Sequence, residues 1–313
     1  MQLLSSLLSH DGLVHDRIYT QSLGIELLVD VLQEMDLEST EGFVLDSTID
    51  RLLHMLRELQ SGSSATSLEE DLLDNLGDFF CLLSSSSYYR PILVRLNCVH
   101  MLVDMLRSEK HSLAAAGLKM LNHCLADNRE ACNCFVEVLG LKPLGAILTG
   151  RVSFSKKKQD LLRSIEEHTM SIANSLLKNC TDEFLVRASS KFIELDLEKL
   201  VCVMRVFNTC SERMGSQTPI SAEKGSDEEK YLSRCERGLF TLQQASLVIL
   251  RVFNNSDDLI KGRILVALTA EKVPMQELMF TVHEYIDLLN AERSQDEIAR
   301  LRTFLSNLQT LAF

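Results

Sequence analysis

Residues Asn128–Thr149 read NREACNCFVEVLGLKPLGAILT, and the rest of the chain is best understood from this stretch. Glycine has no side chain to restrict the backbone, so we expect a sharp turn at Gly140. Apolar residues recur there at spacings of three and four, as in amphipathic helices: Ala131, Cys134, Phe135 and Val138 before the glycine, and Leu141, Leu144, Ile147 and Leu148 after it. Two short helices joined at a pivot form one unit of a helical repeat.

Two other stretches have the same form. They are HDRIYTQSLGIELLVDVLQ, with a predicted pivot at Gly24, and YYRPILVRLNCVHMLVDMLR, with a predicted pivot at Asn97. Glycine and asparagine enter the left-handed region at a helix end more readily than other residues do. Asn97 and Gly140 are 43 residues apart, within the roughly 40–47 of armadillo and HEAT repeats. The pattern predicts an all-α, armadillo/HEAT-like α-solenoid superhelix.

The predicted domain organisation follows from these repeats and from the polar breaks between them. We expect armadillo-type repeats over residues 1–214, with an inserted helix near 42–60. Residues 215–229 are polar and acidic, and are predicted to be a mobile acidic loop. Residues 230–313 are predicted to be C-terminal helical repeats that continue the solenoid, beginning with one long apolar helix over Tyr231–Phe253.

The composition favours a nearly all-helical protein, since only 4 of 313 residues are proline and 13 are glycine. A formal net charge of -12 argues against binding to nucleic acid and suits basic peptide partners. No apolar run reaches the ~18 residues that span a bilayer, so no membrane partner is expected. Nine cysteines, an odd number at scattered apolar positions, indicate reduced thiols of an intracellular protein.

The chain carries none of the common motifs of catalysis. It has no G-x-S-x-G, no P-loop, no G-x-G-x-x-G and no H-E-x-x-H. The best metal candidate is the set of soft ligands His123, Cys124, Cys132 and Cys134. Adjacent residues on a helix point about 100° apart, so His123 and Cys124 converge poorly on one ion. We therefore expect a non-enzymatic protein without a metal or a cofactor.

A stack of such repeats has a long concave surface that suits extended peptides. Four acidic residues interleave with the apolar face of the helices after the pivots, and they are the candidate partner-binding residues: Glu26, Asp30, Glu34 and Asp104. On the concave side they would favour lysine- and arginine-rich segments through charge-assisted hydrogen bonds. A solvated outer face is the alternative, which the sequence leaves open.

Three peripheral features have simpler alternatives beside their functional interpretation. An apolar helix face close to Met1 lacks a polar capping helix: it consists of Leu3, Leu4, Leu7 and Leu8. Either a preceding segment is missing, or fraying is tolerated, or this edge pairs with another copy or with a partner. The lysines Lys156–Lys158 are an import signal or, more simply, solvated charge. Tyr88 and Tyr89, followed by Arg90, are a weak signal for base stacking.

Three segments resemble the beta-catenin-like protein 1 family. The family's Phe-Val-x-x-Leu-Gly-Leu is matched by residues 135–141, and EEDLLDNLGDFFCLLSSSSYYRPIL is similar to the family as well. The family also has an acidic cluster before Tyr-Leu-x-Arg and then Gly-Leu-Phe-x-Leu-Gln, matched here by Asp227, Glu228, Glu229, Tyr231, Leu232, Arg234, Gly238, Leu239, Phe240, Leu242 and Gln243. The three segments keep the family's order, and the resemblance covers nearly the whole chain.

This resemblance implies an armadillo-type nuclear protein of the pre-mRNA splicing machinery. It implies association with the spliceosome through the nineteen complex and binding of basic, localisation-type segments of a Myb-domain splicing factor, without catalytic activity. The chain differs from the family in lacking its N-terminal tail and first repeats. The alternative is a general cytoplasmic armadillo adaptor for protein–protein interaction.

Overall fold

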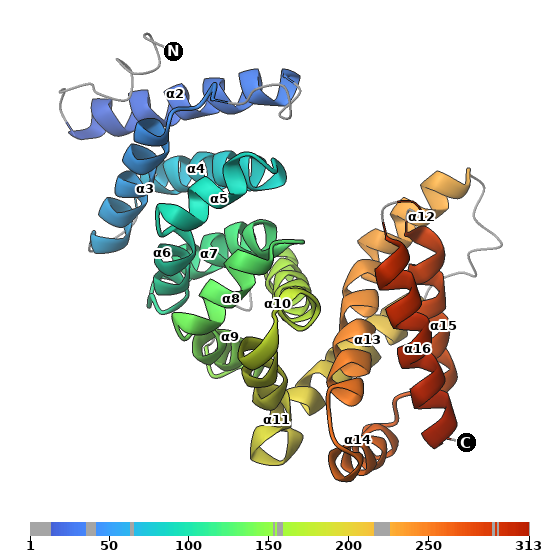
Figure 1. Ribbon diagram of the computed structural model, residues 1–313. Helices are drawn as coiled ribbons and strands as arrows, with labels where there is room; N and C mark the ends of the chain where they lie inside the picture. The colour runs from blue at the N-terminus through green and yellow to red at the C-terminus, as the bar shows by residue number, and fades with distance from the viewer. Residues whose placement is uncertain are drawn as a thin grey trace. The chain divides into compact units, whose positions relative to one another are not determined.

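The computed structural model describes residues 14–35, 42–62, 66–152, 154, 159–215, 226–289, 292 and 294–312, which contain helices and turns but no strand (Figure 1). The helices are α2 (Val14–Glu34), α3 (Asp46–Ser61), α4 (Ser67–Ser85), α5 (Tyr89–Arg95), α6 (Cys98–Leu106), α7 (His111–Leu125), α8 (Arg129–Glu137), α9 (Leu141–Leu148), α10 (Gln159–Asn179), α11 (Asp182–Gly215), α12 (Asp227–Glu236), α13 (Leu239–Asn254), α14 (Asp258–Ala270), α15 (Met275–Leu288) and α16 (Gln295–Ala312). The predicted all-α class is confirmed.

The chain divides into two compact units. Unit 1 comprises residues 1–143 with 154–161, and unit 2 comprises residues 144–153 with 162–313. The predicted division at residues 214 and 230 stays a prediction. Most of the predicted acidic loop, residues 216–225, lies outside the described residues. Its last four residues begin a helix, because Ser226 and Glu229 form a capping box at the start of α12.

In unit 1, α2 packs against α4 and α4 packs against α7, so these helices lie side by side. Ile25, Leu28 and Leu32 are fully or almost fully buried and form the core-facing side of α2. Asn75 of α4 fixes the contact between α2 and α4, since its Nδ2 donates to the carbonyl and the hydroxyl of Ser22 at 3.1 and 3.0 Å. The two helices are therefore held together by apolar burial and by a polar link.

The three predicted pivots have different outcomes. Asn97 is left-handed, with φ 59°, directly before α6, as predicted. At the next pivot the left-handed residue is Leu139, with φ 63°, and not Gly140. Gly140 is needed for space, because a Cβ there would lie 2.6 Å from the ring of Phe135. The pivot at Gly24 is wrong: α2 is continuous through it, since burial of one long apolar face outweighs the roughly 1 kcal/mol by which glycine disfavours a helix.

A capping box begins α4: the Thr66 hydroxyl accepts from the Glu69 backbone N–H, while the Glu69 carboxylate accepts from the Thr66 N–H. One predicted helix boundary needs correction. The predicted single helix over Tyr231–Phe253 is in fact two, because the chain turns at Gly238 with φ 108° between α12 and α13. A positive φ of this size is available to glycine and strained for other residues.

In unit 2, α13 is the central helix, packed against α11, α12, α14, α15 and α16. It carries Arg251, a cation only 1% exposed. The Arg251 Nε donates to Asn174 Oδ1 at 2.8 Å, and its Nη2 pairs with the carboxylate of Glu297. Asn174 in turn donates to Gln244 Oε1 at 2.8 Å. A polar network therefore joins α10, α13 and α16 inside an otherwise apolar core.

Candidate protein-interaction surface

Glu26, Asp30 and Glu34 lie exposed on α2, away from its buried side. Their spacing of four residues places them in one row along the helix. No ion pair joins these carboxylates to another described residue. The structure thus brings together three of the four predicted partner-binding residues and leaves them open to a cationic partner.

A second set of acids, which the sequence analysis missed, lies on α4. Glu70, Asp71, Asp74 and Asp78 are all exposed. Asn75 of α4 contacts Ser22 of α2. Asp71 lies one helical turn from Asn75, and Glu26 lies one helical turn from Ser22. Acids of both helices therefore border the Asn75–Ser22 contact. We call Glu26, Asp30, Glu34, Glu70, Asp71, Asp74 and Asp78 the acidic surface. The recurrence of acids every four residues in EEDLLDNLGD was the signal that could have revealed its second half.

The acidic surface has a large excess of negative charge. Lys119 of α7 reaches it, with Nζ 2.5 Å from Asp78 Oδ1. Partial burial raises the pKa of Asp74; Lys119 acts against this, whereas Asp78, Asp71 and Glu70 raise it further. One lysine therefore does not neutralise the neighbouring carboxylates, and an additional cation would relieve their mutual repulsion.

Asp104, the fourth predicted residue, lies in different surroundings. It is on α6, which packs against α3, α5, α7 and α8, and Figure 1 shows α6 apart from α2. Arg107 Nη1 donates to the Asp104 carboxylate at 2.5 Å, and Arg107 Nη2 donates to the carbonyl of Val138 at 3.0 Å. Asp104 is thus already paired and is not part of the acidic surface. Partner binding by any of the four residues stays a prediction.

Two of the four candidate metal ligands, Cys124 and Cys132, have other partners. Cys124 Sγ lies 3.0 Å from the Ser84 hydroxyl, and Cys132 Sγ donates to the carbonyl of Leu125 at 3.3 Å. Within the described ranges, no group of three or more histidine, cysteine, aspartate or glutamate side chains could hold a metal ion. The cysteines are all free, and burial raises the pKa of Cys81 to about 12.

The peripheral features are only partly described. Leu3, Leu4, Leu7, Leu8 and Lys156–Lys158 lie outside the described residues. Tyr89 is buried and its hydroxyl accepts from the Val44 N–H at 3.0 Å, so it is not available to stack on a base. Among the helices that the structure describes, none alone is long and apolar enough to cross a membrane. Only α8 and α9 taken together reach that length and composition, and they are bent by 86° to each other.

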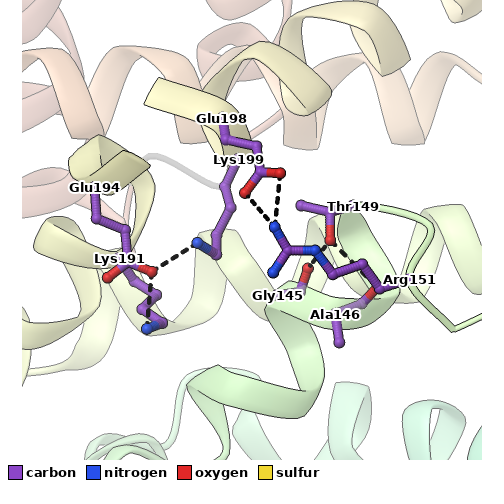
Figure 2. Close-up of polar contacts among 8 residues, drawn as sticks. All are labelled: Gly145, Ala146, Thr149, Arg151, Lys191, Glu194, Glu198 and Lys199. Carbon is purple, nitrogen blue, oxygen red and sulfur yellow. Dashed lines mark hydrogen bonds and ion pairs between the residues drawn. The ribbon is translucent and has the colours of Figure 1, made fainter. Parts of the chain in front are cut away.

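A cluster of ion pairs surrounds a break in α11 (Figure 2). Leu195, Asp196 and Leu197 are left-handed, with φ of 50°, 57° and 67°. The Glu194 carboxylate accepts from Lys191, before the break, at 2.8 Å and from Lys199, after the break, at 2.7 Å. Burial opposes ionisation of Glu194, but hydrogen bonds from both lysines hold its pKa below the usual value.

The same cluster extends to the segment after α9. Arg151 Nη2 donates to both carboxylate oxygens of Glu198 at 2.8 Å, and the Thr149 hydroxyl donates to the Gly145 carbonyl at 2.9 Å (Figure 2). Gly145 admits the Lys199 side chain, since a Cβ there would lie 2.8 Å from Lys199 Cε. These charges are paired with one another, so the cluster stabilises the break and offers no free charge to a ligand.

A family model described as "Catenin-beta-like, Arm-motif containing nuclear" matches residues 15–283. Human "Beta-catenin-like protein 1" is 27% identical over 301 residues, covering 90% of this chain and 53% of the relative. The homolog of Schizosaccharomyces pombe is 22% identical over 262 residues, covering 80% of this chain and 44% of the relative. The chain thus spans about half the length of the curated relatives it matches.

Solved structures with a similar fold include armadillo proteins. A designed armadillo repeat protein in complex with the peptide (KR)4 gives a TM-score of 0.56 at 10% identity, covering 97% of this chain and 98% of the other. An engineered protein gives a TM-score of 0.59 at 15% identity, covering 99% and 98%. At these identities the likeness concerns the fold alone, and it confirms the predicted armadillo class.

Proposed function

Because this chain belongs to the catenin-beta-like, Arm-motif-containing family, we propose that it is a non-enzymatic scaffold of the pre-mRNA splicing machinery. In this proposal it works in the nucleus and binds basic segments of partner splicing proteins. Its similarity to relatives named "Beta-catenin-like protein 1" supports the splicing role, and its armadillo fold supports the role of a scaffold. The acidic surface is the observation that supports basic partners.

The geometry of the acidic surface suits an extended basic segment. Acids one helical turn apart have Cβ atoms roughly 5–6 Å apart. Alternate side chains of an extended peptide are roughly 7 Å apart, because each residue rises about 3.3 Å. Alternate lysines or arginines can therefore meet successive acids of α4, such as Glu70, Asp74 and Asp78. Charge-assisted hydrogen bonds would then give affinity with a strong salt dependence.

Charge reversal tests this proposal. The (KR)4 peptide serves as a probe, and Asp71→Lys with Asp74→Lys is expected to lower its affinity about tenfold or more, since attraction becomes repulsion. Fluorescence anisotropy at two salt concentrations measures the change. Asp50→Lys, an exposed change on α3, is the matched control and should alter affinity little. Unchanged affinity after the double reversal would contradict binding at the acidic surface.

The splicing role needs a separate experiment. Affinity purification of the full chain from its source cells, followed by identification of the co-purifying proteins, should recover splicing factors. The Asp71→Lys, Asp74→Lys variant should recover fewer of them than the Asp50→Lys variant. Recovery of cytoplasmic partners without any splicing factor would favour the general adaptor instead.

A further inference from the structure

α2 also carries a row of exposed apolar side chains on the face opposite its core. Contiguous exposed apolar side chains are unusual on a soluble surface, whereas single ones are common. The row has a spacing of four residues and consists of Tyr19, Leu23, Leu27, Val31 and Met35, which are 57%, 41%, 46%, 45% and 37% exposed. It extends along about four helical turns, and Met35 follows directly after the last residue of α2.

The acids of α2 border this apolar row. Glu26 lies three residues after Leu23, and Asp30 lies three residues after Leu27, so each acid is a surface neighbour of the row. A partner surface complementary to this face would have an apolar row bordered by basic side chains.

We propose that this face of α2 docks an amphipathic, basic α-helix of a partner protein. The partner helix would present leucine, isoleucine or methionine every three to four residues, flanked by lysine or arginine. An apolar row spaced by helical turns packs against a matching row of another helix, as ridges pack into grooves. The inference rests on the proposed function, because the basic flank of the partner uses Glu26, Asp30 and Glu34.

A second copy of this chain is a poorer occupant. Pairing α2 with itself would bring two acidic rows close together, which is unfavourable. Arg17 is the one lysine or arginine in the sequence of α2, and its Nε is buried, so no exposed cation row is present to compensate. The charges therefore favour a basic partner over self-association.

The test compares two peptides of about 18 residues, roughly five helical turns. One is an amphipathic Leu/Lys helix, and the other has the same composition shuffled so that its leucines share no helix face. The amphipathic peptide should bind about tenfold more tightly or better. Leu23→Ser with Leu27→Ser should abolish that preference and leave (KR)4 binding unchanged. Leu259→Ser, at a residue 77% exposed on α14, is the control and should change neither.

Each outcome is decisive. Equal binding of the two peptides, or full affinity in the Leu23→Ser, Leu27→Ser variant, overturns the inference, and (KR)4 binding in the same assay keeps the proposed function. If the parent chain prefers the amphipathic peptide but does not bind (KR)4, the proposed function is overturned instead. A dimer that this double variant dissociates in sedimentation would assign the face to a second copy. Hydrogen-exchange protection of residues 1–13 that the variant removes would assign it to this chain's own leading segment. Either result overturns the inference.

Discussion

Gly140 and Gly77 are both helix-associated glycines in very different surroundings. A Cβ at Gly140 would lie 2.6 Å from the Phe135 ring, whereas a Cβ at Gly77 would meet nothing within 4 Å. We expect Gly140→Ala to lower the free energy of unfolding by about 1–3 kcal/mol through overpacking. Gly77→Ala, inside α4, should raise it by about 0.4–1 kcal/mol, because alanine restricts the unfolded chain. Urea unfolding of both variants measures the difference, and similar values would contradict the steric argument.

Asp74 provides a test by pH. Burial and neighbouring acids raise its pKa in the folded state, so its contribution favours folding at acid pH and is lost as pH rises through the folded pKa. At pH 7 the ionised carboxylate therefore opposes folding. Asp74→Asn should be more stable than the parent chain at about pH 7 and lose this advantage near pH 4, around the usual pKa of aspartate. Unfolding measured at both pH values checks this, and an advantage that grows toward acid pH would contradict it.

At the scale of elements, the break in α11 is the most strained segment described. Each non-glycine residue in the left-handed region costs about 1–2 kcal/mol, and asparagine tolerates the region better than leucine. Leu195 is left-handed and 65% exposed, so replacing it loses little burial. We expect Leu195→Asn to raise the free energy of unfolding by about 0.5–1 kcal/mol.

Leu232→Asn is the matched control for that change. Leu232 is 61% exposed in the regular helix α12, where asparagine is a poorer helix former than leucine. The control should therefore be destabilised by roughly 0.5 kcal/mol. If both variants change stability in the same direction, the strain at Leu195 is not relieved by asparagine.

Helical periodicity predicted some elements well and failed where long-range packing decides. It located α8 and α9, because their apolar spacing and the break between them are local. It placed a break at Gly24, where burial on α4 keeps α2 continuous, and it passed over the turn at Gly238. Spacing identified the acids of α2 and could also have identified those of α4, but spacing along one helix does not reveal that α2 and α4 are neighbours.

At the scale of the whole molecule, the two compact units each have their own core. In repeat proteins each repeat contacts mainly its nearest neighbours. A cavity made by replacing a buried leucine should therefore lower the stability of its own unit more than that of the other unit. Leu76→Ala in unit 1, at a fully buried residue, should expose the buried thiol of Cys124 at a lower urea concentration than in the parent chain. The same variant should shift exposure of Cys210, in unit 2, by less.

A thiol reagent followed by mass spectrometry distinguishes the two cysteines. Leu200→Ala, also at a fully buried residue but in unit 2, is the reciprocal variant and should affect Cys210 more than Cys124. Equal shifts for both thiols in both variants would show a single cooperative transition, contrary to the expectation.

The buried Arg251 also limits which substitutions this chain can accept during evolution. Replacing Arg251 alone would leave the Glu297 carboxylate buried without its cation, which is strongly destabilising. Replacing Arg251, Glu297 and Asn174 together by apolar residues can be nearly neutral. We therefore expect Arg251, Glu297 and Asn174 to be inherited or lost as a set among relatives. The exposed acids can be replaced one at a time, so the interior of unit 2 should vary less among relatives than the acidic surface does.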